Sequence, residues 1–187
     1  TRMQAYALNA HFSIEQKGRN AGGFPMNFNG TAGVWRKSCI EDAGGWHADT
    51  LTEDLDLSYR AQLKGWKFHF LYDVSAPAEL PVAVQALKTQ QYRWTKGAAE
   101  TSRKHLCRVW QSDWPAKNKI HATSHLLSSS IFLFILLLAL LSIPLLLIKA
   151  SRPDLAAWFW TFSALSLGIL SWYGIYTTAN KGFGNSL

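Results

Sequence analysis

The most marked hydrophobic pattern of the chain lies towards its C-terminal end. Residues 126–148 form 23 consecutive positions without a formal charge, and residues 155–179 form 25 more. About 20 apolar residues suffice to cross the roughly 30 Å of hydrocarbon in a bilayer, whereas a core helix of a soluble protein usually keeps a polar stripe. The pattern therefore predicts two transmembrane helices, which the polar turn 149–154 joins into a hairpin.

Residues 1–125 show shorter and more mixed patterns. Apolar residues at three- and four-residue intervals predict a helix over about residues 1–17. A glycine-rich loop over 18–25, an extended segment over 26–34 and a short helix over 35–43 are expected to follow. The double glycine after the short helix marks its end, because glycine readily adopts the left-handed conformation that closes helices.

The next pattern has a clear beginning and a clear end. Thr52 has the residue type of an N-cap, and Gly65 is typical of a C-cap. Alternating aromatic and polar residues over 66–73 predict a strand, and a further helix is expected to contain residues 90–94 and to continue towards Leu106. Since helices and strands alternate, the predicted fold class is α/β.

Charge divides the chain into two parts. Residues 1–125 contain 16 of the 19 Lys and Arg residues and 11 of the 12 Asp and Glu residues, and the whole chain has a formal net charge of +7. Six of the bases lie in residues 96–125, directly before the first apolar stretch. The positive-inside rule places this segment and the polar region before it in the cytoplasm of a multi-pass membrane protein. We therefore attribute the charge to anionic lipid and topology, not to nucleic-acid binding.

The first candidate for chemistry is the sequence Thr52-Glu53-Asp54. One interpretation is a capped helix whose acidic residues lie where the helix dipole favours them. In the other interpretation, Asp54 is a general base that accepts a proton from a substrate hydroxyl. Asp54-Leu55-Asp56 also has the D-x-D pattern of metal sites in sugar-nucleotide enzymes. We exclude it as a metal site, because residues i and i+2 of a helix do not face each other.

The second candidate is the group Gln90, Arg93 and Trp94, whose spacing places the three residues on one face of a helix. They could form a solvated stripe with Trp94 in the core. In the functional interpretation, Arg93 binds a diphosphate leaving group through forked hydrogen bonds. Trp94 then offers a flat apolar face to a sugar ring, and Gln90 donates a hydrogen bond to the substrate or fixes its neighbours.

The cysteine and histidine residues indicate no metal site. Cys39 and Cys107 have neither pairing context nor metal-binding spacing, and we expect free thiols in a cytoplasmic region. His11 and His47 are expected to be polar surface or loop residues, because no second ligand stands at a metal-binding distance in the sequence. We therefore expect no metal ligands in this chain.

The order of the motifs is more informative than any single motif. The chain contains F-N-G-T-A-G-V-W-R at 28–36, T-L-T-E-D-L-D-L-S-Y-R-A-Q-L-K-G-W at 50–66 and Q-Q-Y-R-W at 90–94. Together these strings resemble the C-terminal part of processive family 2 glycosyltransferases, the cellulose synthase superfamily. The similarity is greatest to the glucomannan mannosyltransferase-like branch and its bacterial relatives, and it covers roughly residues 1–125.

The resemblance implies the C-terminal part of a GT-A glycosyltransferase domain, followed by a transmembrane helical hairpin. Residues 1–95 would be the C-terminal half of the catalytic domain, residues 96–125 a basic amphipathic interface segment, and residues 126–187 the two transmembrane helices. The implied reaction is inverting transfer of a hexose from a nucleotide sugar to a growing β-glycan at the cytoplasmic membrane face, coupled to translocation of the glycan.

Roles for individual residues follow from the same resemblance. Asp54 would be the general base, with Thr52 and Glu53 beside it. The Q-x-x-R-W site, next to the diphosphate and the acceptor end, would consist of Gln90, Arg93 and Trp94. The acceptor path would be lined by Phe28, Asn29, Gly30 and Thr31.

The resemblance also implies components that this sequence does not contain. In the family, the half of the domain that binds the nucleotide, with its D-x-D metal ligands, precedes the segment matched here. We therefore expect the chain to be a C-terminal fragment that is inactive alone. The donor would be a UDP- or GDP-sugar, and a divalent metal ion, Mg or Mn, would be held upstream.

Two other functions are compatible with the same residues. One is a membrane glycosyltransferase that transfers sugar to a lipid, such as diacylglycerol, and releases a short product. The other is a non-catalytic membrane scaffold that keeps the fold. The intact T-E-D and Q-x-x-R-W motifs favour an enzyme, because a scaffold needs neither. The expected partners are a nucleotide sugar, a glycan or lipid acceptor, and the lipid bilayer.

Overall fold

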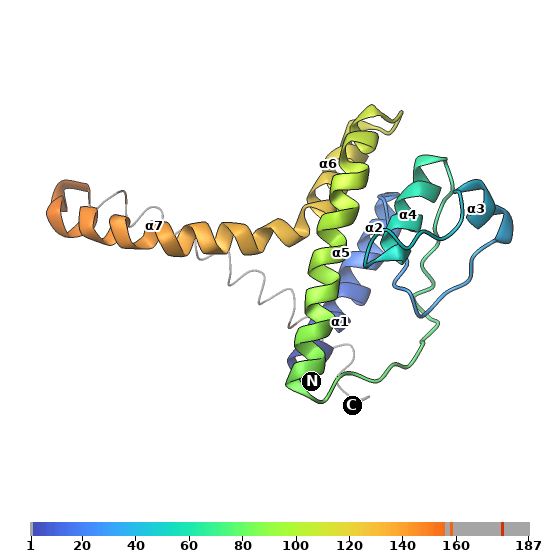
Figure 1. The fold of residues 1–187 in the computed structure, drawn as a ribbon, viewed down its shortest axis with the longest axis horizontal. Coiled ribbons are helices and arrows are strands. Elements are labelled where there is room, and N and C mark those ends of the chain that lie inside the picture. The colour runs from blue at the N-terminus through green and yellow to red at the C-terminus, as the bar shows by residue number, and fades with distance from the viewer. Residues whose placement is uncertain (1, 156–157, 159–176, 178–187) are drawn as a thin grey trace.

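The computed structural model describes residues 2–155, 158 and 177, which form helices joined by loops (Figure 1). No β-strand occurs among these described residues, so the α/β prediction is not confirmed. The predicted second transmembrane helix over 155–179 falls almost wholly outside them, and the hairpin is not confirmed either.

The first helical segment is continuous and comprises α1 (Arg2–Ala10), the π-helical turn η1 (His11–Gln16) and α2 (Lys17–Gly22). It is longer than predicted, because two glycines of the predicted loop 18–25 are helical. A glycine inside a helix costs only about 1 kcal/mol relative to alanine, which packing can offset. The helix ends at Gly23, whose φ of 63° is in the left-handed region.

The helices α3 (Lys37–Asp42) and α4 (Glu53–Leu63) form where the sequence predicts them. The end of α4 is a Schellman motif at Gly65, whose φ is 93°. The Gly65 N–H donates to the carbonyl of Gln62 at 3.0 Å, and the N–H of Trp66 donates to that of Ala61 at 3.2 Å. The predicted C-cap glycine is therefore present, and it closes the helix.

The predicted strand over 66–73 does not form: residues 66–71 have no regular secondary structure, and residues 72–73 form a turn. The side chains at 66, 68 and 70 are partly buried, whereas those between them are exposed, so the alternation does separate two faces. The backbone N–H of Phe70 donates to the side-chain oxygen Oδ1 of Asn20 at 3.0 Å. A strand also requires a pairing partner, and no extended backbone in the described part of the chain supplies one.

The longest helix, α5 (Val84–Gln111), runs the length of the helical body (Figure 1). It packs against α4 and against α6 (Ala116–Leu126). The predicted boundary after residue 95 falls inside α5, so the basic segment 96–125 consists of the second half of this helix and α6. The division into three parts stays a prediction.

The core surrounds α4. One cluster contains Cys39 and Ala43 with Leu57 and Ala61 of α4, and partly buried aromatic residues cover it. A second cluster joins Tyr59 of α4 to α5 and α6, through Val109, Ala122 and Leu126. Residues 56–62 of α4 are all buried, so the helix that follows the T-E-D motif is enclosed on every side.

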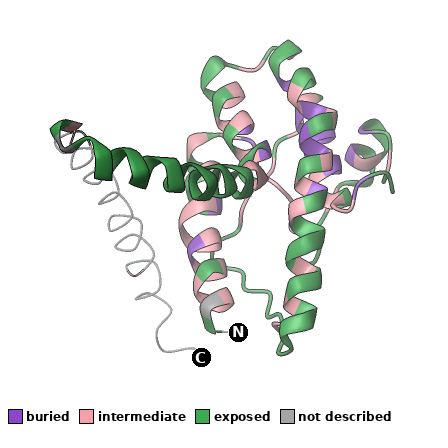
Figure 2. Ribbon diagram, turned by 60° about the vertical axis from the view of Figure 1, so that its left-hand side comes forward, coloured by how far each residue is buried: buried purple, intermediate pink, exposed green. Residues whose placement is uncertain are grey.

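The helix α7 (Ile131–Ser151) follows the short turn η2 (Ser128–Ser130) and precedes the turn η3 (Pro153–Leu155). It projects from the body as an arm that is exposed along its length (Figure 2). The segment Ser128–Ser151 has a mean hydropathy of 3.2 and is, by length and composition, able to cross a membrane. One such helix among the described residues does not support a multi-pass topology.

Candidate active site

The carboxylate of Asp54 lies in the first turn of α4, partly buried. It faces Gly30 of the F-N-G-T loop, because a β-carbon added to Gly30 would stand 3.0 Å from a carboxylate oxygen of Asp54. Gly30 also has a φ of 78°, a conformation that disfavours other residues. The structure thus brings together two of the predicted motifs, the general-base motif and the acceptor-path loop.

Hydrogen bonds from α4 hold the segment that leads into this loop. The N–H of Phe28 donates to the hydroxyl of Ser58 at 2.9 Å, and that hydroxyl donates to the carbonyl of Asp54 at 2.6 Å. The amide of Gln62 bonds both the N–H and the carbonyl of Met26, at 2.8 and 2.7 Å. Asp54, Ser58 and Gln62 are spaced by four residues, so one face of α4 aligns the loop with its own N-terminus.

Sequence reasoning missed Ser58 and Gln62. The signal that could have found them is the four-residue spacing from Asp54 of two polar residues, which places all three on one face of the helix. Buried polar side chains must find partners, and here the backbone of a distant segment supplies them.

The electrostatic surroundings of Asp54 suit a base. Burial raises the pKa of this carboxyl above its ordinary value, and the charge of Glu53 raises it further. The N–H of Leu55, which donates to Oδ1 of Asp54 at 2.8 Å, and the charge of Arg93 lower that pKa. The Q-x-x-R-W helix lies beside the T-E-D motif, because α5 packs against α4 and Gly97, one turn after Arg93, closely approaches Thr52.

Thr52 occupies the N-cap position of α4, but its side chain makes no capping hydrogen bond. Its hydroxyl instead lies 3.3 Å from that of Thr101 on α5. A β-carbon on Gly97 would stand 2.5 Å from the Thr52 methyl group and 2.8 Å from its backbone nitrogen. Thr52 therefore has the predicted N-cap position, but its side chain does not make the predicted capping hydrogen bond. It instead contacts α5 where that helix passes the T-E-D motif.

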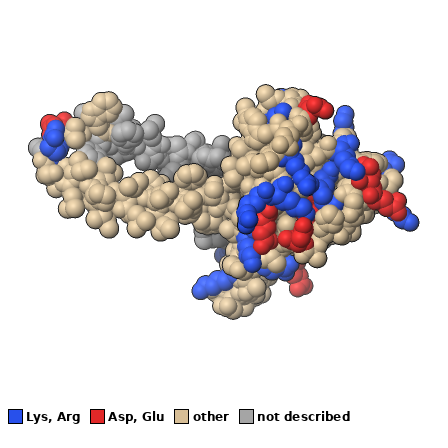
Figure 3. Space-filling model, turned by 45° about the horizontal axis from the view of Figure 1, so that its top comes forward, with Lys and Arg blue, Asp and Glu red and all other residues tan. Residues whose placement is uncertain are grey.

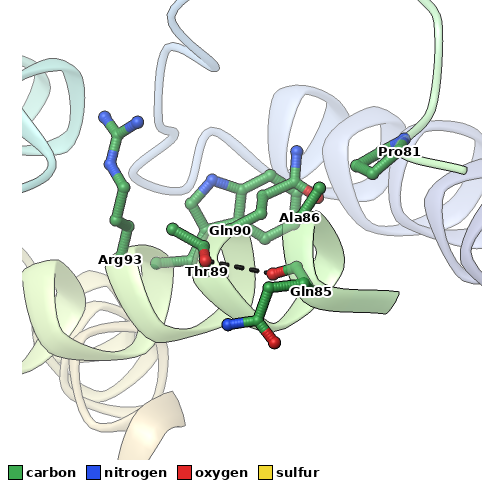
Figure 4. A pocket seen from close by; sticks show the side chains of 7 residues that line it. Pro81, Gln85, Ala86, Thr89, Gln90 and Arg93 are labelled. Carbon is green, nitrogen blue, oxygen red and sulfur yellow. Dashed lines mark hydrogen bonds between the residues drawn. The ribbon is translucent and has the colours of Figure 1, made fainter. Parts of the chain in front are cut away.

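The residues of Q-x-x-R-W lie on the first half of α5, where they line a pocket of about 460 Å³. Arg93 and Gln90 project from the same side of the helix (Figure 4). The amide nitrogen of Gln4 donates to Oε1 of Gln90 at 2.6 Å, which ties α1 to this site. Trp94 is 44% exposed, so it is not a core residue. The other lining residues are Pro81, Gln85, Ala86 and Thr89.

The two carboxylates of the D-x-D pattern have separate surroundings. Asp56 is completely buried and bonds Nε of Arg60 at 2.8 Å, Nζ of Lys104 at 2.8 Å and Nε2 of His105 at 2.7 Å. Burial alone would raise the pKa of Asp56, but hydrogen bonds from His105, Lys104 and Arg60 hold it well below its usual range. Asp56 is thus held by side chains of the protein, among them the cations Arg60 and Lys104.

Three ligand-type side chains do approach one another beside Asp56. Atoms of His47, Asp49 and Asp56 lie within 4.8 Å of one another. The ammonium group of Lys104 stands among them, 2.8 Å from Asp49 and 2.8 Å from Asp56. An ammonium group in this position takes the place that a metal ion would need, so these residues do not fit a metal. Cys39, which is buried, and Cys107, which is exposed, are both free thiols.

Comparison with known sequences shows which proteins this chain is similar to. The model of the family described as "Glycosyl transferase family group 2" matches residues 1–175. The probable glucomannan 4-beta-mannosyltransferase 3 of Oryza sativa subsp. japonica is 51% identical over 104 residues, which are 56% of this chain and 19% of that protein. No solved structure matches the chain.

Two further relatives carry related names. The glucomannan 4-beta-mannosyltransferase 7 of Arabidopsis thaliana is 44% identical over 113 residues, 60% of this chain and 20% of its own length. The probable glucomannan 4-beta-mannosyltransferase 4 of Oryza sativa subsp. japonica is 44% identical over 135 residues, 71% of this chain and 24% of its own length. The chain therefore spans about a fifth of the length of these relatives.

Proposed function

The chain belongs to glycosyl transferase family group 2, and on this premise we propose that it forms the acceptor-activating part of a hexosyltransferase that extends a β-glycan. The approach of Asp54 to Gly30, with the helix that carries Arg93 packed against the same end of α4, carries this proposal. A base, a loop for the acceptor and a cation for the leaving group are the components that displacement at a sugar carbon requires.

In the proposed mechanism, Asp54 accepts the proton of the acceptor hydroxyl as its oxygen attacks the donor sugar. Gly30 leaves room for that hydroxyl, because a larger residue would press on the carboxylate. Arg93 stabilises negative charge on the departing diphosphate through its planar fork of donors. Trp94, half exposed at the pocket, offers a flat face to the terminal sugar ring of the acceptor.

The family's divalent metal ion, Mg or Mn, would bind the diphosphate of a UDP- or GDP-sugar. The described residues do not supply its ligands, because Lys104 stands among the three that approach one another. We propose that the ion is held by residues outside those described, and no step of the mechanism above depends on its position.

The membrane component of the proposal rests on α7 and on charge. Charged side chains are concentrated on the helical body, whereas the arm formed by α7 is nearly free of them (Figure 3). We propose that this arm crosses a bilayer and that the basic second half of α5, with α6, lies on the cytoplasmic side.

The proposal can be tested with membranes from cells that express the complete gene product. The membranes are incubated with radiolabelled GDP-mannose or UDP-glucose and compared with membranes that carry the Asp54→Asn variant. We expect insoluble β-linked polysaccharide from one of the donors and none from the variant. Label in the lipid extract would instead favour the lipid-acceptor alternative, and no product from either donor would favour a scaffold.

A further inference from the structure

The loop that precedes T-E-D is fastened to the second half of α5. Lys104 bonds both carboxylate oxygens of Asp49, at 2.9 and 2.8 Å. One turn earlier on the same helix, Oε2 of Glu100 accepts the backbone N–H of Leu51 at 2.9 Å. Residues 49 and 51 are thus held by side chains whose spacing of four residues puts them on one face of α5.

The same lysine also reaches into the core. Its Nζ lies 2.8 Å from Oδ1 of Asp56, which is completely buried on α4. Lys104 therefore bridges a loop carboxylate that is 58% exposed and a helix carboxylate that is 0% exposed. Without the ammonium group, Asp49 and Asp56 would face each other within 4.8 Å, a distance at which like charges repel.

The position of this bridge relates it to the candidate active site. Residues 90, 93, 97, 101 and 104 recur at three- and four-residue intervals, so they follow one face of α5. That face carries Q-x-x-R-W at one end, the close approach to Thr52 in the middle, and the bridge to Asp49 and Asp56 at the other end. The helix α5 thus carries Arg93 and also contacts the T-E-D motif, which contains Asp54.

We infer that Lys104 is a positioning residue, whose ammonium group bridges Asp49 and Asp56 and thereby fixes the T-E-D motif against the helix that carries Arg93. This inference rests on the proposed function. Arg60 and His105 remain bonded to Asp56 when Lys104 is removed, so α4 keeps its buried partners. The loop over 49–52 loses one of its two anchors and keeps only the bond from Leu51 to Glu100, so the start of α4 moves relative to Arg93.

The test uses the complete gene product in membranes and the substitution Lys104→Met, which keeps the length of the side chain and removes its charge. We expect the turnover rate to fall roughly ten- to a hundredfold, because displacing reacting groups by about 1 Å has effects of that size. Affinity for the nucleoside diphosphate should stay within about twofold of wild type, since Arg93 itself is intact. Arg103→Met, at an exposed position one residue away, is the matched control and should retain the wild-type rate.

Hydrogen–deuterium exchange provides a readout that does not depend on activity. Peptides that cover residues 47–55 should exchange faster in Lys104→Met, whereas peptides within 56–63 should not. Adding Asp49→Asn to Lys104→Met removes the repulsion from Asp56 and should restore part of the lost rate. The single variant Asp49→Asn changes only an exposed side chain, so it can replace Lys104→Met if that variant folds poorly. Asp49→Asn should lower the turnover rate by a smaller factor than Lys104→Met.

The outcomes separate this inference from the proposed function. A wild-type rate and wild-type exchange in Lys104→Met, together with an inactive Asp54→Asn, would overturn the positioning role and leave the proposed reaction intact. Equal loss of turnover and diphosphate binding, with faster exchange throughout α4, would also overturn it, because the lysine would then be a general stabilising residue. Activity in Asp54→Asn would contradict the proposed function itself.

Discussion

At the scale of single residues, the account depends on the different surroundings of two carboxylates in one helix. Asp56 is bonded by three side chains, two of them the cations Arg60 and Lys104, and it is completely buried. Asp54 is only partly buried, and its pKa is raised by burial. A carboxylate with a raised pKa accepts a proton more readily than an exposed one, and one oxygen of Asp54 lies beside Gly30.

The raised pKa predicts a pH dependence of sugar transfer. A general base acts when it is deprotonated, so the turnover rate should fall as the pH falls through the pKa of Asp54. That acid limb should lie above the ordinary aspartate value of about 3.9. Because the charge of Glu53 contributes to the upward shift, Glu53→Gln should move the limb to lower pH. If the acid limb of the rate–pH profile has the same position in Glu53→Gln as in the wild type, Glu53 does not raise the pKa of Asp54.

Arg93 and Trp94 should fail in different ways. Arg93→Lys keeps the charge but loses the planar fork that matches phosphate oxygens, so turnover and nucleoside diphosphate binding should both weaken, by roughly ten- to a hundredfold in rate. Trp94→Ala removes the flat face and should mainly raise the acceptor concentration needed for half-maximal rate. Titration calorimetry and acceptor-dependent rates separate the two. If both variants bind the nucleoside diphosphate like the wild type and lose only thermal stability, Arg93 and Trp94 have a structural role.

The residues that carry the site were predictable to different degrees. Asp54, Arg93 and Trp94 stand in motifs whose order could be read along the chain, and their roles stay predictions. Ser58 and Gln62 could not be assigned in this way, because their partners belong to the backbone of residues 26–28, some thirty positions earlier. The four-residue spacing of Ser58 and Gln62 from Asp54 places them on one face of α4, but it does not identify the distant segment that they bind.

At the scale of elements, the site depends on how closely α5 approaches the start of α4. Gly97 makes that approach possible, because Thr52 occupies the space where any larger side chain would stand. The helices themselves were predicted well where local signals set their ends, as at Gly65. The strand over 66–73 was wrong because alternation reports only which side chains are buried, whereas a strand also needs a paired neighbour.

The contact at Gly97 predicts the effect of a single methyl group. Gly97→Ala should lower the free energy of unfolding by about 1–3 kcal/mol through overpacking, although alanine is the better helix former. It should also lower transfer activity, since α5 must move away from T-E-D. Gly18→Ala is the matched control: it lies within α2 with open space around it and should stabilise by about 0.5–1 kcal/mol. Thermal unfolding checks both, and equal behaviour of the two variants would contradict the close contact.

At the scale of the whole molecule, a polar helical body is joined to an apolar arm (Figure 1). The arm was predictable from composition alone, because a long apolar run without charges is typical of a transmembrane helix. The arrangement of the body was not, since it depends on α4 being enclosed by elements from four separate parts of the sequence. The buried polar groups that organise it, such as Asp56, look in the sequence like surface charges.

The proposed orientation of the body can be checked through the thiols. Cys107 is exposed on α5 and Cys39 is buried. A membrane-impermeant maleimide should therefore label peptides that contain Cys107 in inverted vesicles and not in right-side-out vesicles, if the basic segment is cytoplasmic. Cys107→Ser should abolish the labelling of these peptides. Strong labelling in right-side-out vesicles that depends on Cys107 would reverse the proposed topology.

The most direct test of the central claim, that Asp54 is the general base of sugar transfer, is the turnover rate of the Asp54→Asn variant in intact membranes. The change keeps the shape of the side chain and removes its basic oxygen, and a general base typically supplies about a hundred- to ten-thousandfold in rate. We predict a loss of at least about a hundredfold, with unchanged expression and membrane insertion. A rate within a few-fold of wild type would contradict the account and leave Asp54 a structural residue at the start of α4.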